Sequence, residues 1–389
     1  MATLLFICGS LQPGRDGVGD YTRRLAAVLQ TSGNRVQLLA THDKVVTHPT
    51  TEAQRADGAT VEVVRIPYAT PSATRTRVLQ RTVDALQPDW ISLQYVPHAF
   101  NKYGLPLGLL QTLRSLRTSA ARHVMFHELW ITPRGPWDFK QRAIAAVEHA
   151  AVRWLIGTGF APSVLHTHLP AYHQRLLAKG ADVRPLPLFA NIAAPPSPTH
   201  GASPGRFRVV FFSQLATPAE VVEFLTALAA YLAAERTELA VFLLGGNATR
   251  AAASATVLRS ALPAAQVEAL GFLAAEELSE HFLRADLAVT PVQHHEIGKS
   301  GTVAAFLSHR LPVAAPVVTD RGESFFLPAL NRAVLDRFSA EGLADARAAA
   351  RGLDTQLISV AHIAATFADH LSAARPARPV AASPTALTP

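Results

Sequence analysis

Short apolar runs that alternate with longer segments of helical periodicity are the feature that most constrains the fold of this chain. In the first half these runs predict strands, at Thr3–Cys8, Arg35–Ala40, Val61–Ile66, Asp89–Tyr95 and His123–Phe126. Most are separated by segments with apolar residues at helical spacing, namely Tyr21–Gln30, Thr74–Leu86 and Leu105–Leu116. Strands and helices in this order form a mostly parallel sheet with both faces covered. The first half therefore predicts a doubly wound α/β domain.

The alternation stops at Asn191–Gly205, where four prolines lie among small and polar residues. Proline fits neither a helix interior nor a central strand, so this stretch predicts an interdomain linker. Beyond it strands are predicted at Arg208–Phe212, Leu239–Leu244, Val267–Leu270, Leu287–Thr290 and Val313–Ala315. The predicted helices are Pro218–Ala234, Ala251–Leu262, Ala275–Arg284 and Thr302–His309. We expect an N-terminal domain over 1–190, a linker over 191–206, a C-terminal domain over 207–355, a closing helix over 356–373 and a disordered tail over 374–389.

Composition narrows the class of protein. The 389 residues suffice for two domains with cores of their own. The single cysteine, Cys8, lies in an apolar run and predicts a buried thiol in a reducing compartment such as the cytoplasm. A net charge of +7 favours an anionic partner. Nucleic acid is not expected, because arginines such as Arg23 and Arg24 lack interleaved aromatic residues. No apolar run approaches the roughly 18 residues of a membrane span, and we expect no export.

The loop Gly9–Gly19 follows the first predicted strand, at the edge of a parallel sheet where ligands bind. Its glycines would let a ligand approach the backbone, and the next helix, expected to begin near Asp20, would offer unpaired N–H groups. The spacing is not G-x-G-x-x-G, which argues against an NAD-type site. The alternative is a flexible loop.

His127 follows the strand His123–Phe126, where an imidazole could bind a sugar hydroxyl or exchange a proton near neutral pH. Gln94 and Tyr95 end the preceding strand and would line the same cleft with an amide and an aromatic face. The alternatives are an ordinary structural histidine and a satisfied strand end.

The segment Glu296–Thr302 is the most informative, because Lys299 stands beside Ser-Gly-Thr at a predicted helix start. A cation, two hydroxyls and free backbone N–H groups suit a diphosphate. The order of a Walker A loop is absent, which argues against phosphoryl transfer from ATP. The alternative is an N-cap beside a solvated lysine. The neighbouring His294-His295-Glu296 lacks H-E-x-x-H spacing, so no metal site is expected.

Several motifs resemble, in order, those of the family 4 retaining glycosyltransferases, which have the GT-B fold of two Rossmann-like domains facing across a cleft. They are DGVGDYTRRLAAVL (Asp16–Leu29), FHELW (Phe126–Trp130), PLFANI (Pro187–Ile192), LLGGNATR (Leu243–Arg250), the donor core Leu270–Ala315 and TDRGESF (Thr319–Phe325). The likeness covers nearly the whole chain up to the tail, and the donor core is its most specific part.

The resemblance implies transfer of a sugar from a nucleotide diphosphate sugar to an acceptor, with retention and without a metal or other cofactor. The N-terminal domain would then lie on the acceptor side and the C-terminal domain would bind the donor. His127 and Glu296 would contact the transferred sugar. Donor-binding residues would be Gly17, Gly19, Gly245, Phe272, Gly298, Lys299, Ser300, Gly301 and Thr302. Acceptor-binding residues would be Asp16, Gln94 and Tyr95.

The chain departs from the family pattern at three places. The family's second donor-site glutamate would fall at Ala304, or at Ala305 if the alignment is set on the later Leu-Pro-Val. The loop Phe212–Pro218 lacks the arginine and lysine that commonly bind the phosphates, a charge that Lys299 would supply. Arg310 stands where a helix-ending glycine is usual.

These features favour a cytoplasmic, bacterial-type hexosyltransferase that builds a polysaccharide, a glycolipid or a glycosylated small molecule. The cluster Arg134–Arg142 would suit a lipid-linked acceptor at the inner face of a membrane. One alternative is a catalytically silent GT-B protein that binds a nucleotide sugar or a partner transferase. Another is an epimerase of the nucleotide sugar, which would need several carboxylates in the cleft. The sugar, the base and the acceptor stay open at this point.

Overall fold

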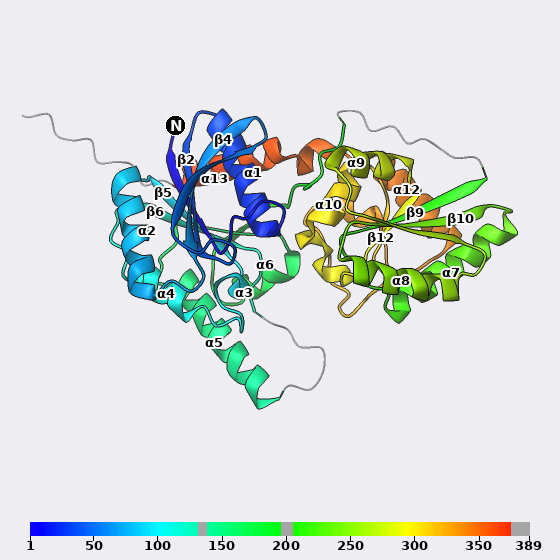
Figure 1. Ribbon diagram of the computed structural model, residues 1–389, viewed down its shortest axis with the longest axis horizontal. Helices are drawn as coiled ribbons and strands as arrows, with labels where there is room; N and C mark the ends of the chain where they lie inside the picture. Colours follow the sequence, from blue (N-terminus) through cyan, green and yellow to red (C-terminus); the bar gives the residue numbers. More distant parts are fainter. Residues whose placement is uncertain (131–137, 196–204, 375–389) are drawn as a thin grey trace, which may run out of the picture.

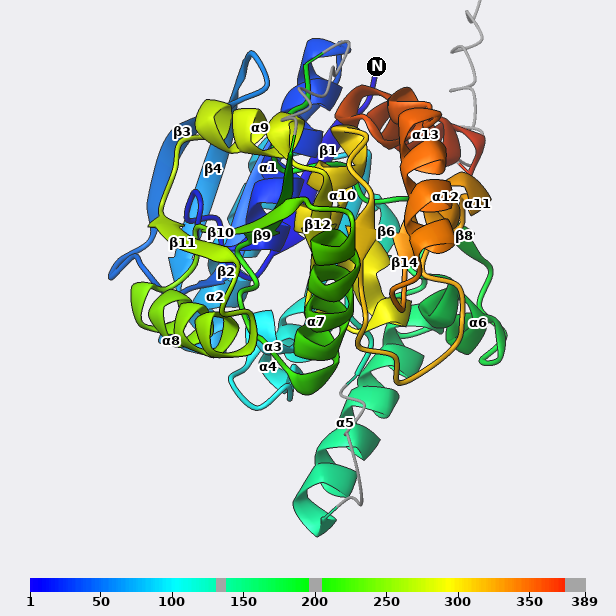
Figure 2. The same ribbon diagram turned by 90° about the vertical axis from the view of Figure 1, so that its right-hand side faces the viewer.

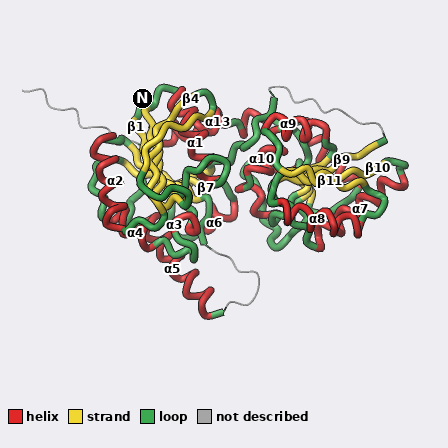
Figure 3. Tube along the Cα trace, viewed as in Figure 1, coloured by secondary structure: helices red, strands yellow, loops and turns green. Residues whose placement is uncertain are grey.

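The computed structural model describes residues 1–130, 138–195 and 205–374, which form two α/β domains (Figure 1). Each is built on one sheet, and helices cover both faces of each sheet (Figure 3). The fold class predicted from the alternation of strands and helices, two doubly wound Rossmann-like domains, is confirmed. Part of the predicted linker (196–204), most of the predicted tail (375–389) and Arg134 lie outside the described residues.

The N-terminal sheet has the strand order β3-β4-β2-β1-β5-β6-β7-β8. Its strands are β1 (Thr3–Cys8), β2 (Arg35–Asp43), β3 (Thr50–Ala56), β4 (Ala59–Pro67), β5 (Trp90–Tyr95), β6 (Ala121–Phe126), β7 (Val164–Thr167) and β8 (Val183–Pro185). All neighbours pair in parallel except β3, which is antiparallel to β4 at the edge. Alternate residues of β1 fill opposite cores, Leu5 and Ile7 on one face and Leu4 and Phe6 on the other.

The helices of this domain are α1 (Gly17–Thr31), α2 (Ser72–Leu86), α3 (Pro97–Phe100), α4 (Leu107–Arg114), α5 (Phe139–Ile156) and α6 (Pro170–Leu177). Most of them lie against the sheet, but the beginning of α5 projects from the body of the domain (Figures 1 and 2). Asp138 caps α5 by accepting from the Gln141 N–H at 2.7 Å.

The C-terminal sheet has the order β11-β10-β9-β12-β13-β14, and its neighbours all pair in parallel. The strands are β9 (Arg206–Phe212), β10 (Glu238–Leu244), β11 (Gln266–Gly271), β12 (Leu287–Val289), β13 (Val313–Ala314) and β14 (Val334–Leu335). The helices are α7 (Ala219–Ala234), α8 (Ala248–Ala261), α9 (Ala275–Arg284), η1 (His294–Lys299), α10 (Gly301–Ser308), α11 (Pro328–Arg332), α12 (Ala340–Arg351) and η2 (Thr355–Ile358).

The last helix, α13 (Val360–Ala373), returns from the C-terminal domain and packs on α1 of the N-terminal domain (Figure 1). Its buried side chains join the N-terminal core, where the ring of Phe367 stacks on Phe6 with centroids 5.7 Å apart. The two domains are therefore joined both by the chain near residue 190 and by this helix. No helix in the described part of the chain is long and apolar enough to cross a membrane.

Candidate active site

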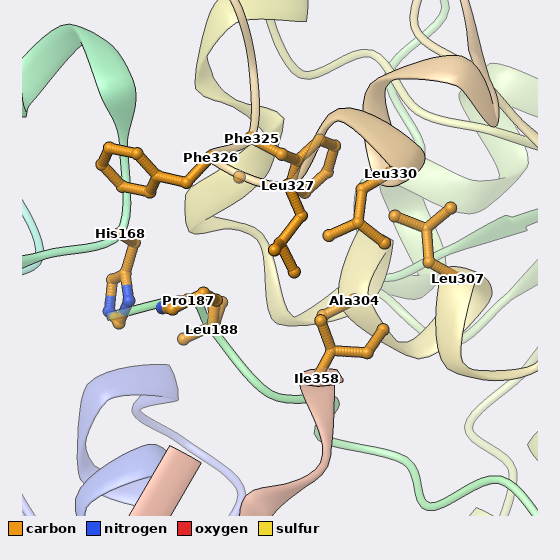
Figure 4. Close-up of a pocket in the computed structure, with 11 residues that line it drawn as sticks. His168, Pro187, Leu188, Ala304, Leu307, Phe325, Phe326, Leu327, Leu330 and Ile358 are labelled. Carbon is orange, nitrogen blue, oxygen red and sulfur yellow. The ribbon is translucent and has the colours of Figure 1, made fainter. Parts of the chain in front are cut away.

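A narrow cleft lies between the domains, where the loops after the parallel strands face each other (Figure 4). The N-terminal domain contributes His168, and the segment leading to the linker contributes Pro187 and Leu188. The opposite wall is apolar and includes Ala304, the position at which the family's second glutamate was expected, and Phe325. This part of the cleft therefore lacks the carboxylate that the resemblance would place there.

Lys299 joins the two domains at the edge of this cleft. Its Nζ lies 3.3 Å from the Glu296 carboxylate on its own 3₁₀ helix, where the i to i+3 spacing puts both on one face. It also lies 3.7 Å from the Glu128 carboxylate and 3.3 Å from the Tyr172 hydroxyl of the N-terminal domain. Partial burial opposes the charge, but Tyr172 and the two carboxylates outweigh it and raise the pKa of Lys299. The lysine is therefore a held cation rather than the solvated one of the alternative interpretation.

The helix α10 begins at Gly301, one residue before the prediction. Ser300 is its N-cap, and the Ser300 hydroxyl accepts from the Val303 N–H at 3.4 Å. The first N–H groups of such a helix have no intrahelical partner, so Gly301 and Thr302 begin an end suited to an anion. Lys299 directly precedes this end, and the structure thus brings together the cation and the helix start that the sequence predicts.

Gly298 and Gly301 lie against protein atoms on the side where a Cβ would stand. A Cβ at Gly298 would overlap the carbonyl oxygen of Ser324 and lie 2.9 Å from Leu169 Cδ2 of the N-terminal domain. A Cβ at Gly301 would lie 2.5 Å from Asn191 Nδ2. Both contacts explain the glycines by close packing at the domain junction, independently of any donor.

His127 lies in a chain of buried hydrogen-bonding groups rather than on an open surface. Its Nε2 is 2.9 Å from Gln94 Oε1, and its Nδ1 is 2.9 Å from Nε2 of His168. Burial, then the neighbouring histidines His168 and His123, lower the pKa of His127 well below its ordinary value. The ring is therefore neutral, and both its nitrogens are already occupied.

The series of hydrogen-bonded side chains continues from Gln94 through the sheet to α13. Gln94 Nε2 is 2.8 Å from Ser92 Oγ, Ser92 Oγ is 2.8 Å from His123 Nδ1, and His123 Nε2 is 2.9 Å from His166 Nδ1. His166 Nε2 is in turn 2.8 Å from Nδ1 of His370. The end of the cleft is thus linked to the helix that ties the domains together.

The Leu186 carbonyl determines which ring nitrogens in this series donate and which accept. His168 Nδ1 is 2.9 Å from the Leu186 carbonyl, which only accepts, so His168 donates there and its Nε2 accepts from His127. Neutral His127 then needs a donor at Nε2, where the structure has the Gln94 oxygen. Exchanging the oxygen and nitrogen of this amide, which have nearly the same shape, supplies that donor. With the amide in that orientation, each ring nitrogen in the series pairs a donor with an acceptor.

Gln94 and Tyr95 do not line the cleft, which corrects their expected location. They are 1% and 0% exposed, because β5 is a central strand covered on both faces. The Gln94 amide forms hydrogen bonds with His127 and Ser92, and the Tyr95 ring packs against Phe100 and Phe126. Gln94 and Tyr95 therefore support the cleft wall from the domain interior and do not contact a ligand in the cleft.

The first loop differs from the prediction at its end. The helix α1 begins at Gly17, because the carboxylate of Asp16 caps it by accepting from the Gly19 N–H at 2.7 Å. Gly17 and Gly19 thus lie in the first helical turn. A Cβ at Gly19 would lie 2.6 Å from the Ser10 carbonyl oxygen, whereas Gly17 has no atom within 4 Å of that position. Only Gly17 leaves room for a ligand.

Gly245 and Phe272 lie together at the carboxyl ends of β10 and β11. The Gly245 N–H donates to the Gly271 carbonyl at 2.6 Å, and both glycines have positive φ, 68° each. Phe272 is 93% exposed, so its ring is free to meet a ligand. Among the described residues, no group of three or more histidine, cysteine, aspartate or glutamate side chains is arranged to hold a metal ion.

Sequence reasoning did not select the partners that complete the site. His168 directly follows β7, a four-residue strand whose apolar run is too short to stand out. Glu128 and Tyr172 acquire their importance from Lys299 of the other domain. The one available signal was the pair His166 and His168, two residues apart.

Comparison with known proteins bears on the fold. No protein-family model matches the chain, and no curated protein matches it. A glycosyltransferase from Rickettsia africae ESF-5 is similar in structure, with TM-score 0.61, 9% identity and coverage of 97% of this chain and 99% of that one. Anabaena HepE, solved in complex with UDP and glucose, has TM-score 0.54, 16% identity and coverage of 96% and 100%.

The chain has the GT-B fold. A putative UDP-N-acetylglucosamine 2-epimerase from Listeria monocytogenes also has a similar structure, with TM-score 0.53, 11% identity and coverage of 96% of each chain. Identities this low show the shared fold and leave the reaction to be argued from the site.

Proposed function

We propose that this protein is a glycosyltransferase that moves a sugar from a nucleotide diphosphate sugar to an acceptor hydroxyl. The observation that carries the proposal is Lys299, a cation at the start of α10 that carboxylates from both domains hold in the interdomain cleft. The resemblance of residues 270–315 to the donor core of the family 4 enzymes supports it. So does the presence of nucleotide-sugar enzymes among the proteins of similar structure.

In this proposal the donor diphosphate lies at the start of α10, where it replaces Glu128 and Glu296 as the ionic partner of Lys299. When the bond between the anomeric carbon and the diphosphate oxygen breaks, the leaving group gains charge. Lys299 and the N–H groups of Gly301 and Thr302 stabilise that charge, so the reaction needs no metal. The acceptor oxygen bonds to the anomeric carbon on the face that the diphosphate leaves, which retains the configuration, and the acceptor proton passes to the diphosphate.

Glu296 is the residue best placed to contact the transferred sugar. It precedes the start of α10 by one turn of 3₁₀ helix, and its carboxylate is released when Lys299 turns to the diphosphate. His127, whose ring nitrogens are both engaged, acts in this scheme by holding the N-terminal wall of the cleft. Phe272 and Gly245 would border the base.

The test is calorimetric titration with UDP, ADP, GDP and their glucose conjugates. We expect one nucleotide to bind, and Lys299→Ala to weaken it at least about tenfold, the value of one lost charge-assisted hydrogen bond. Lys140→Ala, which removes the same charge from the projecting helix α5, is the matched control and should bind like the natural protein. Equal affinities of all three proteins would overturn the role of Lys299.

Turnover then separates the alternatives. A transferase consumes the nucleotide sugar only when an acceptor is present. Conversion without an acceptor into an epimer would identify an epimerase, the activity that the name of the Listeria monocytogenes protein indicates. Binding without any consumption would identify a silent GT-B protein that serves a partner transferase.

We also propose a cytoplasmic enzyme that touches the inner face of the membrane through α4 and α5. Phe139 is 88% exposed and Leu107 is 57% exposed, and the cations of Lys140 and Arg142 lie beside Phe139 in sequence. Exposed apolar side chains beside cations suit an anionic lipid surface. Sedimentation with phosphatidylcholine vesicles, with and without phosphatidylglycerol, tests this: binding that Phe139→Ser leaves unchanged would contradict it.

A further inference from the structure

A second cavity, of about 960 Å³ and open to solvent, lies in the N-terminal domain at the carboxyl ends of β1 and β2. It shares no lining residue with the interdomain cavity. Side chains with charges or hydrogen-bonding groups dominate its wall: Ser10, Gln12, Arg15, Asp16 and Lys44. Ligands of doubly wound sheets bind at this end of the strands.

The wall of this cavity is held rigid by one buried carboxylate. Asp43 accepts from the Leu11 N–H at 3.1 Å and from the Val45 N–H at 2.9 Å, so it ties together the two loops that form the wall. Arg65 pairs with it through two hydrogen bonds, of 2.9 and 3.0 Å, and donates to Gln12 at 2.6 Å. Burial opposes ionisation, but Arg65 and the backbone donors lower the pKa of Asp43. The loops are therefore fixed before any ligand arrives.

The cations of the wall are free to bind a ligand. Arg15 and Lys44 are exposed, and neither forms an ion pair with a residue in the described part of the chain. Lys44 Nζ rests 5.9 Å from the ring centroid of Tyr68. One carboxylate, Asp16, opposes them, but one of its oxygens is spent on the Gly19 N–H. Beside them Gly17 leaves the first turn of α1 open.

We propose that this cavity binds a phosphate group carried by the acceptor, an inference that rests on the proposed transferase. Arg15 would grip two phosphate oxygens with its planar fork, and Lys44 would neutralise the remaining charge. Burial raises the pKa of Asp16, whose free oxygen would accept a hydrogen bond from an acceptor hydroxyl. A neutral glycan would leave both cations without a partner. The phosphate belongs either to a soluble sugar phosphate or to a lipid headgroup.

The test uses glycerol 3-phosphate as the soluble probe and glycerol as its neutral counterpart, in calorimetric titrations at low salt. We expect the phosphate ester alone to bind, and Arg15→Ala/Lys44→Ala to weaken it at least about tenfold. The control Arg35→Ala/Arg117→Ala removes the same charge from exposed positions outside the cavity and should bind like the natural protein. Equal weakening in both variants, or the absence of any ester or vesicle binding that Arg15→Ala/Lys44→Ala removes and the control keeps, overturns the proposal.

An experiment with lipid vesicles tells whether the phosphate belongs to a lipid headgroup or to a soluble sugar phosphate. Sedimentation with phosphatidylcholine vesicles containing phosphatidylglycerol that is lost in Arg15→Ala/Lys44→Ala and kept in the control assigns the phosphate to a headgroup. Specific binding of the ester alone assigns it to a soluble acceptor. Nucleotide titration of the same variants separates this proposal from the proposed function. A double variant that binds nucleotide normally but loses the ester supports both, whereas ester binding without nucleotide binding keeps the phosphate site and rejects the transferase.

Discussion

The two walls of the interdomain cleft place their polar groups in opposite ways. The N-terminal wall buries polar side chains and pairs them with one another, as in the hydrogen-bonded series from His168 to His370. The same domain does so again beside its second cavity, in the Asp43–Arg65 pair. The C-terminal wall is apolar where it meets the cavity, and its charge is concentrated at Lys299. We infer that the N-terminal wall is rigid, whereas the C-terminal wall carries a cation, Lys299, that can change partners.

The largest expected effect is in the N-terminal domain, at the buried pair of Asp43 and Arg65. Asp43→Asn leaves buried Arg65 with only the half-exposed Glu52 as ionic partner, and we expect the free energy of unfolding of this domain to fall by about 3–5 kcal/mol. All four tryptophans, Trp90, Trp130, Trp137 and Trp154, precede residue 190 in the sequence, so urea unfolding followed by their fluorescence reports on the N-terminal half of the chain.

The matched control is Glu52→Gln. Glu52 also pairs with Arg65, at 3.2 Å, but its side chain is 39% exposed. An exposed pair contributes about 0.2–1 kcal/mol, so this variant should unfold nearly like the natural protein. Losses of equal size in the two variants would show that burial does not set the strength of the network.

The second effect concerns pH and the histidine chain. Burial, then the charge of His370, lower the pKa of His123 to about 3, and burial lowers that of His168 to about 4. At pH values between these pKa values and the ordinary 6.5, His123 and His168 are protonated in the unfolded chain but neutral in the folded chain. Stability is therefore full above pH 6.5 and falls as pH drops toward 3–4, by up to about 1.4 kcal/mol per pH unit for each histidine.

Tryptophan fluorescence during urea unfolding at pH 7.0, 6.0 and 5.0 measures this slope. Replacing His123 by glutamine removes one titrating group, and we expect a shallower slope together with a loss of about 1–3 kcal/mol at pH 7. His48→Gln, at an exposed position, should leave the slope as it is. A slope that His123→Gln does not change would contradict the assignment of a neutral buried ring.

The third effect is on the C-terminal wall. Gly298→Ala forces a Cβ against the Ser324 carbonyl and against Leu169 of the other domain, and we expect a loss of about 1–3 kcal/mol. Differential scanning calorimetry measures it, since this wall has no tryptophan. Gly322→Ala, where the nearest atom would be Asp320 Oδ1 at 3.6 Å, serves as control. An unchanged melting temperature for Gly298→Ala would show that the domains do not need this close approach.

The contrast between the walls also explains what the sequence predicts. The strand Thr3–Cys8 and the helix Ala275–Arg284 match the structure to the residue, because apolar periodicity is a local property. The polar edge strand β3 and the short strand β7 carry no such pattern. Lys299 was selected from its local motif, but its partners Glu128 and Tyr172 come from the other domain, and no local pattern encodes that packing.

The smallest expected effect is on nucleotide binding and concerns the contact between Glu128 and Lys299. Glu128 is the carboxylate through which the N-terminal wall holds Lys299, at 3.7 Å and with 40% of its side chain exposed. An exposed pair is worth about 0.2–1 kcal/mol, so Glu128→Gln should free Lys299 and tighten nucleotide binding by about two- to fivefold. Calorimetric titration compares it with Glu52→Gln, which changes the same charge away from Lys299. Weaker binding in Glu128→Gln would mean that the carboxylate positions the lysine for the diphosphate instead of competing for it.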